Sequence, residues 1–292
     1  MSEPTELHRR FLEVWPEYER MIAGSETLLA EGKGDPQACS RTLITMYRWL
    51  GGMSLALGKP DDVARDYFRR AATSAVRMMG LPGSTVGPRV VDVKVSVSAN
   101  GKAHVDSERP RPAQVLSGKP SLIAYLDAMT FVVAFGSADD IAAMARYGPD
   151  DYHTEGLVVG RDVHRSAAGL RAWLRGQDDE ARRELRSALR GKPTPGDAAL
   201  LAVAEGDAAR FARHLAARLD AHRHRYRDEP HDPDGLVCVH ALGLCRLAAA
   251  VGIPSPEDPL IPLRLTDPLP HRDVVPPLPS LWSRISKIFG GE

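Results

Sequence analysis

The sequence predicts a mostly α-helical fold of antiparallel helical hairpins, with tetratricopeptide-like packing and one small β-hairpin insertion. Three observations support this prediction. Apolar residues recur three and four positions apart along most of the chain, as they do on the buried face of a helix. A turn pattern that combines glycine with a following aspartate occurs three times between such stretches. One short stretch alternates apolar and polar residues instead, as a strand does.

The repeated turn lies in three stretches, Leu55–Ala72, Trp173–Leu189 and Leu201–Leu219. In each, we expect the first helix to end at a glycine, which adopts a left-handed backbone without steric cost. We expect an aspartate to cap the next helix by accepting its unpaired amide hydrogens. The spacing between the stretches is irregular and the full tetratricopeptide consensus is missing. Whether the hairpins form a regular superhelix is therefore left open.

The helices are expected in the following order. The first opens at Thr5 and Glu6, and Pro16 predicts a kink or break within it. The second spans about 36–57 and is stopped by Gly58, after which Pro60 suits the start of a third helix at 63–79. Further helical patterns cover 121–135, 138–147, 162–175, 178–189, 197–204, 207–226 and 236–251.

The β-hairpin is predicted at about 90–107, where valines alternate with polar residues before Asn100 and Gly101. A two-residue loop would mix apolar and polar residues on each face. A three-residue loop with Gly101 left-handed separates them, so we prefer it. It pairs Val97 with Ala103, Val95 with Val105 and Lys94 with Asp106. Because an isolated two-stranded hairpin is marginal in water, it should pack on a helix.

The chain of 292 residues exceeds the usual size of one domain. We expect an N-terminal helical region at 1–120 that contains the β-hairpin, and a helical-hairpin region at 121–265. A proline-rich tail with a short amphipathic end follows at 266–292. A single continuous domain is the alternative.

Composition predicts a soluble, cytoplasmic protein. Lys plus Arg and Asp plus Glu both number 38, so no global charge favours nucleic acid or an anionic membrane. Three cysteines, an odd and sparse set, fit a reducing compartment. The longest apolar stretch, Leu236 to Val251, contains His240 and Arg246 and is too short for a bilayer span. We expect it to be a buried helix and expect no membrane partner.

The sequence contains no recognisable active-site motif. The sequence has no GxSxG, phosphate-binding glycine loop, HExxH or CxxC, so we expect neither enzymatic activity nor a cofactor. The histidines around 214–231 suggest a metal, but His222 and His224 would point about 200° apart on one helix, so no metal site is expected. Residues 156–227 hold 15 basic and nine acidic residues, interleaved and poor in aromatics, which does not favour nucleic-acid binding.

Residues 198–265 resemble the immunity protein 49 family of bacterial polymorphic toxin systems. The similar features are a small-residue helix ending at Gly206-Asp207, Phe211 and Leu215 on the next helix, His222 near its end, Gly235-Leu236 entering an apolar helix, Gly252 after it, and Leu260-Ile261-Pro262. The resemblance weakens towards the N-terminus. It implies a mostly α-helical, non-enzymatic protein that binds and neutralises a toxin encoded beside it.

The expected function is therefore stoichiometric occlusion of a toxin protein. Alternatives are a helical-repeat adaptor or regulatory module, and an enzyme without a recognisable motif. Exposed loops between rigid helices suit partner binding. The candidate contact residues are Asn100 and Lys102 at the hairpin tip, and Asp150, Asp151, Tyr152 and His153 in an acidic loop. The sequence does not indicate the toxin, the contact surface or the oligomeric state.

Overall fold

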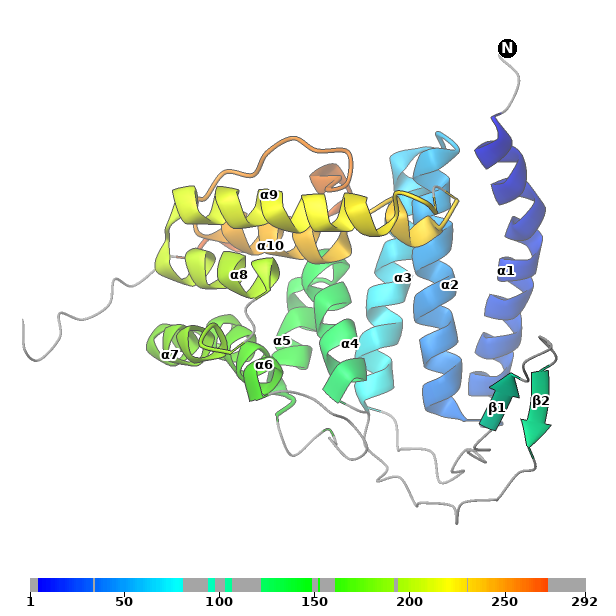
Figure 1. Ribbon diagram of the computed structural model, residues 1–292, viewed down its shortest axis with the longest axis horizontal. Helices are drawn as coiled ribbons and strands as arrows, with labels where there is room; N and C mark the ends of the chain where they lie inside the picture. The colour runs from blue at the N-terminus through cyan, green and yellow to red at the C-terminus, as the bar shows by residue number, and fades with distance from the viewer. Residues whose placement is uncertain are drawn as a thin grey trace, which may run out of the picture.

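The computed structural model describes residues 5–33, 35–80, 94–97, 103–106, 122–148, 152, 161–191, 194–229 and 231–272. Within these ranges the chain forms ten α-helices, and the predicted mostly α class is confirmed (Figure 1). The helices are α1 (Glu6–Ala30), α2 (Pro36–Ala56), α3 (Asp61–Gly80), α4 (Leu122–Phe135), α5 (Ala138–Arg146), α6 (Arg161–Leu174), α7 (Asp178–Ala188), α8 (Pro195–Glu205), α9 (Ala208–Arg225) and α10 (Val239–Ala250). Two 3₁₀ turns, η2 (Pro233–Gly235) and η3 (Leu263–Leu265), flank α10.

Helices adjacent in sequence pack as hairpins. The closest pairs are α1 with α2, α2 with α3, α6 with α7 and α8 with α9. In Figure 1, α1, α2 and α3 stand side by side, whereas α8, α9 and α10 lie beside this group and run roughly perpendicular to it. The hairpins therefore change direction along the chain and do not stack as one regular superhelix.

The three predicted glycine turns are present and share one geometry. Gly58, Gly176 and Gly206 have left-handed φ angles of 63°, 80° and 71°. In each turn, the amide after the glycine donates to a carbonyl five residues earlier. These bonds are Lys59 to Ser54, Gln177 to Ala172 and Asp207 to Ala202, each 2.9 Å. They satisfy carbonyls that the end of a helix leaves unpaired, so glycine ends each first helix as expected.

The predicted aspartate cap is correct for only one of these hairpins. Asp207 caps α9 by accepting the Arg210 amide at 2.9 Å. At α7 the cap position holds Gln177, whose side chain makes no capping hydrogen bond. At α3, Asp61 is already the first helical residue. The helix α3 begins two residues before the predicted 63, whereas α7 begins at Asp178 as predicted. In both helices the aspartates lie in the first turn and not at the cap position, and there the helix dipole still favours negative charge.

The helix α1 runs unbroken through Pro16, contrary to a predicted break. Thr5 caps it as expected, accepting the His8 amide. Phe11 and Trp15 on one side of the proline and Ile22 on the other are all buried, which fixes both halves of α1 against the neighbouring helices. This packing offsets the loss of one backbone hydrogen bond at Pro16.

Two strands, β1 (Lys94–Val97) and β2 (Ala103–Asp106), pair antiparallel. Their backbone register places Lys94 opposite Asp106, Val95 opposite Val105 and Val97 opposite Ala103. The loop between them and the side chains of both strands lie outside the described residues. That the hairpin packs on a helix therefore stays a prediction.

One continuous apolar core extends from Phe11 to Leu265. The helix α4 lies within it and contacts α3, α5 and α10. Phe68 of α3 and Phe135 of α4 stack with ring centroids 4.2 Å apart. This stack joins the two regions predicted on either side of residue 120.

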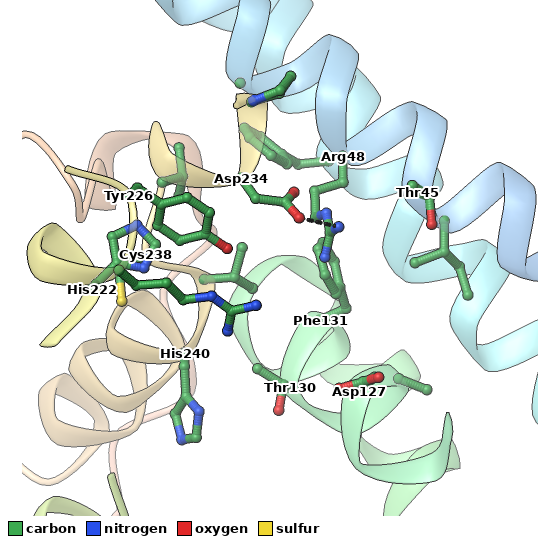
Figure 2. A pocket seen from close by; sticks show the side chains of 18 of the residues that line it. Thr45, Arg48, Asp127, Thr130, Phe131, His222, Tyr226, Asp234, Cys238 and His240 are labelled. Atoms are coloured by element: carbon green, nitrogen blue, oxygen red, sulfur yellow. Dashed lines mark hydrogen bonds and ion pairs between the residues drawn. The ribbon is translucent and has the colours of Figure 1, made fainter. Parts of the chain in front are cut away.

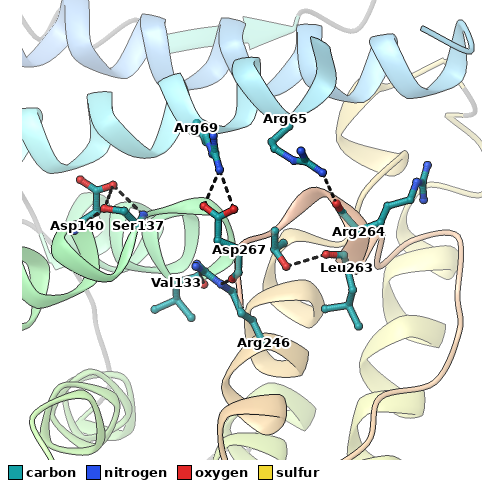
Figure 3. A network of polar contacts seen from close by, with 10 residues as sticks. Arg65, Arg69, Val133, Ser137, Asp140, Arg246, Leu263, Arg264 and Asp267 are labelled. Atoms are coloured by element: carbon teal, nitrogen blue, oxygen red, sulfur yellow. Dashed lines mark hydrogen bonds and ion pairs between the residues drawn. The ribbon is translucent and has the colours of Figure 1, made fainter. Parts of the chain in front are cut away.

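The segment that follows α10 returns across α3 and α4 (Figure 3). Arg65 donates to the backbone carbonyl of Arg264 at 2.6 Å, and Arg69 binds the Asp267 carboxylate at 2.7 Å. Beneath this segment, the Arg246 side chain, which is 2% exposed, donates to the carbonyls of Val133 and Asp267. We call residues 263–272 the C-terminal strap.

Among the described residues, one stretch, Pro233–Ala250, is long and apolar enough to cross a membrane, with a mean hydropathy of 1.2. Of this stretch, 61% is buried inside the protein, and it includes η2 and α10. Burial of this extent is typical of a core helix, as the sequence predicts for 236–251.

Candidate functional site

A hollow of about 580 Å³ opens between two parts of the fold (Figure 2). Residues of α2, α3 and α4 line one side, and residues of α9, η2 and α10 line the other. The hollow therefore depends on the packing of the C-terminal helices against the N-terminal ones. Its volume lies within the range of about 300–1,000 Å³ typical of ligand pockets.

An ion pair joins the two sides of the hollow. Arg48 of α2 and Asp234 of η2 are 2.7 Å apart, and the Trp49 indole donates to the same carboxylate at 2.8 Å. Burial raises the pKa of Asp234, whereas Arg48 and the Trp49 hydrogen bond lower it. The Arg48 guanidinium also lies 5.6 Å from the centre of the Phe131 ring. These contacts hold η2 against α2 and α4.

Close packing fixes η2 where it meets α2. A Cβ atom added at Gly52 of α2 would lie 3.2 Å from the backbone oxygen of Pro233. A Cβ atom added at Gly235 would lie 3.0 Å from the Cβ of Tyr226. Both positions need glycine because backbone approaches backbone or an aromatic side chain at these points.

The side formed by α9, η2 and α10 also contains His222 and Tyr226, near the end of α9. The His222 Nε2 lies 3.2 Å from the Gly235 oxygen, and its ring centroid lies 4.8 Å from that of Tyr226. Burial lowers the pKa of His222, and the charges of Arg218 and Arg225 lower it further. His222 is therefore neutral at pH 7, and its side chain is engaged with the chain's own backbone.

His240 of α10 also lines the hollow, but Figure 2 shows its side chain directed away from the centre. A Cβ atom added at Gly196 would lie 2.9 Å from its Nε2, so the imidazole packs against the start of α8. Burial and the charge of Arg218 lower the pKa of His240 to about 4, although Asp197 opposes the shift.

The lining carries more positive than negative charge. It contains four arginines, Arg41, Arg48, Arg218 and Arg225, and two aspartates, Asp127 and Asp234. The Nε atoms of Arg48 and Arg218 are buried and have no hydrogen-bond acceptor within the described part of the chain. We call this site the basic hollow. Its chemistry suits the binding of an anion.

Nucleophilic chemistry by the cysteines is not favoured. All three cysteines are free and buried. Burial raises the pKa of Cys238, which lines the basic hollow, and raises that of Cys245 to about 11. Both are thiols at neutral pH, whereas the thiolate is the nucleophile.

In the ranges that the structure describes, no group of three His, Cys, Asp or Glu side chains is arranged to hold a metal ion.

Of the predicted contact residues, the structure describes only Tyr152. Its position corrects the expectation that this residue is exposed. Tyr152 is not exposed: only 9% of it is accessible, and its ring stacks on Tyr125 at 5.0 Å. The loop sequence is polar, but Tyr125 on α4 offers the ring an aromatic face in the core. The other predicted contacts, Asn100, Lys102, Asp150, Asp151 and His153, lie outside the described residues.

The basic hollow was not predicted from the sequence. Its ion pair joins residues 186 positions apart, and its arginines come from separate helices. The one available signal was the Asp232-Pro233-Asp234-Gly235 stretch, in which Asp232 accepts the Asp234 amide at 2.8 Å to form a tight turn. That turn holds Asp234 opposite α2.

Comparison with known families identifies the chain's relatives. A family model described as immunity protein 49 matches residues 69–265, about two thirds of the chain. The match extends well beyond the last third, where the resemblance is clearest, and it includes α4, α9 and α10 but not α2. Neither the curated proteins nor the solved structures gave a match. The chain belongs to the immunity protein 49 family.

Proposed function

We propose that this protein is an immunity protein that binds and neutralises a bacterial toxin by stoichiometric occlusion. The observation that carries the proposal is the family match over residues 69–265. Immunity proteins as a family act by binding rather than by turnover. We place the protein in the cytoplasm of the producing cell, as part of a polymorphic toxin system, without a nucleic-acid or membrane partner.

The physical requirement is a stiff surface that buries about 800 Å² against its partner and presents a few anchoring side chains. Four left-handed glycine turns between consecutive helices, together with a continuous core, supply such stiffness. Burial keeps the Cys238 thiol of the basic hollow protonated, which disfavours its use as a nucleophile.

The proposal is tested by co-expressing the protein with the product of each neighbouring open reading frame. We expect one of these products to stop growth alone, and co-expression to restore growth. The two proteins should then co-purify in a one-to-one complex. Failure to rescue growth from any neighbouring product would contradict the proposal, and so would rescue at a catalytic ratio with chemical modification of the toxin.

The loop prediction has its own test. Replacing Asp150 and Asp151 together with alanine should weaken toxin binding if this loop is a contact. Tyr152 is left unchanged because its ring packs in the core. Unchanged affinity would remove the loop from the interface without affecting the proposed function.

A further inference from the structure

We propose that the basic hollow receives an acidic side chain, aspartate or glutamate, from a loop of the bound toxin. This inference rests on the proposed function and specifies one of its contacts. The walls come from α2, α3, α4, α9, η2 and α10, so the site exists only in the folded protein.

The first argument is charge. Four arginines and two aspartates line the hollow, which leaves an excess of two positive charges when its histidines are neutral. Asp234 forms its ion pair with Arg48 and accepts a hydrogen bond from Trp49, and it also interacts with the charge of Arg225. An excess of this size matches one or two carboxylates. A nucleic acid would need an extended basic surface to contact many phosphates.

The second argument is hydrogen bonding. The buried Nε atoms of Arg48 and Arg218 have no acceptor within the described part of the chain. A buried donor left without a partner costs free energy, and an entering oxygen recovers it. Guanidinium groups bind carboxylates through two parallel hydrogen bonds, which makes a carboxylate a fitting acceptor.

The third argument is shape. A hollow of about 580 Å³ exceeds the space that one carboxylate fills. Apolar side chains such as Ile44, Phe131 and Val237 share the lining with the arginines. The aliphatic stem of the acidic residue and its loop neighbours would contact these groups, while the carboxylate meets the guanidinium groups. A protein loop satisfies both requirements better than a small inorganic anion.

The test uses the neighbouring-frame protein that wild type neutralises, in a catalytically inactive form. Arg218→Gln removes a charge from the hollow at similar volume. Arg213→Gln is the matched control, because Arg213 lies exposed on the same helix and does not line the hollow. We expect Arg218→Gln to raise the Kd at least tenfold by titration calorimetry, and Arg213→Gln to change it less than twofold.

A second variant guards against loss of folding, because Arg218 lies beside the Cys238 thiol. Arg41 is exposed at α2, so Arg41→Gln should leave the unfolding midpoint unchanged while it raises the Kd several-fold. If wild type binds and both hollow variants bind as tightly as the control, the inference is wrong and the proposed function stands. If wild type itself binds no neighbouring product, the proposed function fails.

A charge exchange identifies the partner residue. Arg218→Glu should abolish binding, and replacing one aspartate or glutamate of the toxin with lysine should restore it to that variant alone. Restoration by no acidic position would count against a direct pair.

A further experiment tests the basic hollow without the toxin. An acetylated tetraglutamate peptide should shift the Nε–H nuclear magnetic resonance signals of Arg48 and Arg218 at constant ionic strength. Inorganic phosphate should shift them less. A larger response to phosphate, with none to the peptide, would make the hollow a small-anion site and overturn the proposal.

Discussion

Arg69 on α3 donates through one guanidinium nitrogen to both carboxylate oxygens of Asp267, each at 2.7 Å, across 198 residues of sequence. Both side chains are about half exposed, so water screens this pair. The buried Arg246 lies below it and binds two backbone carbonyls that no water reaches easily. The two arginines hold the same strap, yet their contributions to stability should differ.

Arg246→Met should lower the free energy of unfolding by about 3 kcal/mol, because the carbonyls of Val133 and Asp267 lose a charged donor. Arg69→Gln, the control at the exposed pair, should lower it by less than about 1 kcal/mol. Urea unfolding followed by circular dichroism measures both values. Equal losses of unfolding free energy in the two variants would show that burial does not make the Arg246 contacts more stabilising than the Arg69 pair.

Gly169→Ala should destabilise the protein by about 1–3 kcal/mol because the added Cβ would lie 2.6 Å from the Leu185 Cγ and 3.3 Å from its backbone nitrogen. Such a contact forces α6 away from α7. Gly24→Ala in α1 is the matched control: nothing lies within 4 Å of its Cβ, and alanine should stabilise the helix by up to about 1 kcal/mol. Thermal unfolding of both variants checks the opposite signs, and a stable Gly169→Ala would contradict the close packing of this hairpin.

Asp207→Ala should cost about 1 kcal/mol because it removes the acceptor for the Arg210 amide at the start of α9. Gln177→Ala occupies the equivalent cap position of α7, where no side-chain bond exists, and should change stability by less than about 0.5 kcal/mol. Chemical unfolding distinguishes them. The same loss at both positions would mean that the cap bond of Asp207 contributes nothing.

His240 predicts a loss of stability in mild acid. Its folded pKa of about 4 lies below the 6.5 of an ordinary histidine, because burial and Arg218 disfavour the charged ring. The unfolded chain therefore takes up the proton first as pH falls. Stability from this group is fully present above pH 6.5 and is lost as pH falls from about 6.5 to about 4.

His240→Gln removes this titration. Between pH 7 and pH 5, wild type should lose about 2 kcal/mol more than the variant, measured by urea unfolding at both values. The comparison cancels other titrating groups that the two proteins share. Parallel losses in the two proteins would show that His240 titrates normally in the fold.

The hairpin turns were predictable because their causes are local. Gly58, Gly176 and Gly206 each end a helix through bonds to residues at most five positions earlier, and glycine alone adopts their φ angles without strain. The ends of these helices were predictable for the same reason, because the bonds that end them are local. The aspartates at α3 and α7 were predicted as caps but lie in the first turn, a difference of one or two positions that the local pattern does not resolve.

The candidate site was not predictable because its causes are distant in sequence. Arg48 meets Asp234 only after α2, α4 and η2 have packed, and nothing in either segment indicates the other. The burial of Tyr152 was not predictable either, because it also depends on a residue distant in sequence. Its polar neighbours indicate exposure, yet Tyr125 on a separate helix buries its ring.

The strap also sets an order of events during synthesis. Ribosomes add about 5–20 residues per second, so Asp267 is made about 10–40 s after Arg69. During that interval Arg65 and Arg69 lack their partners, the Arg264 carbonyl and the Asp267 carboxylate. A newborn chain therefore makes this contact late in its synthesis, well after α3 has been made.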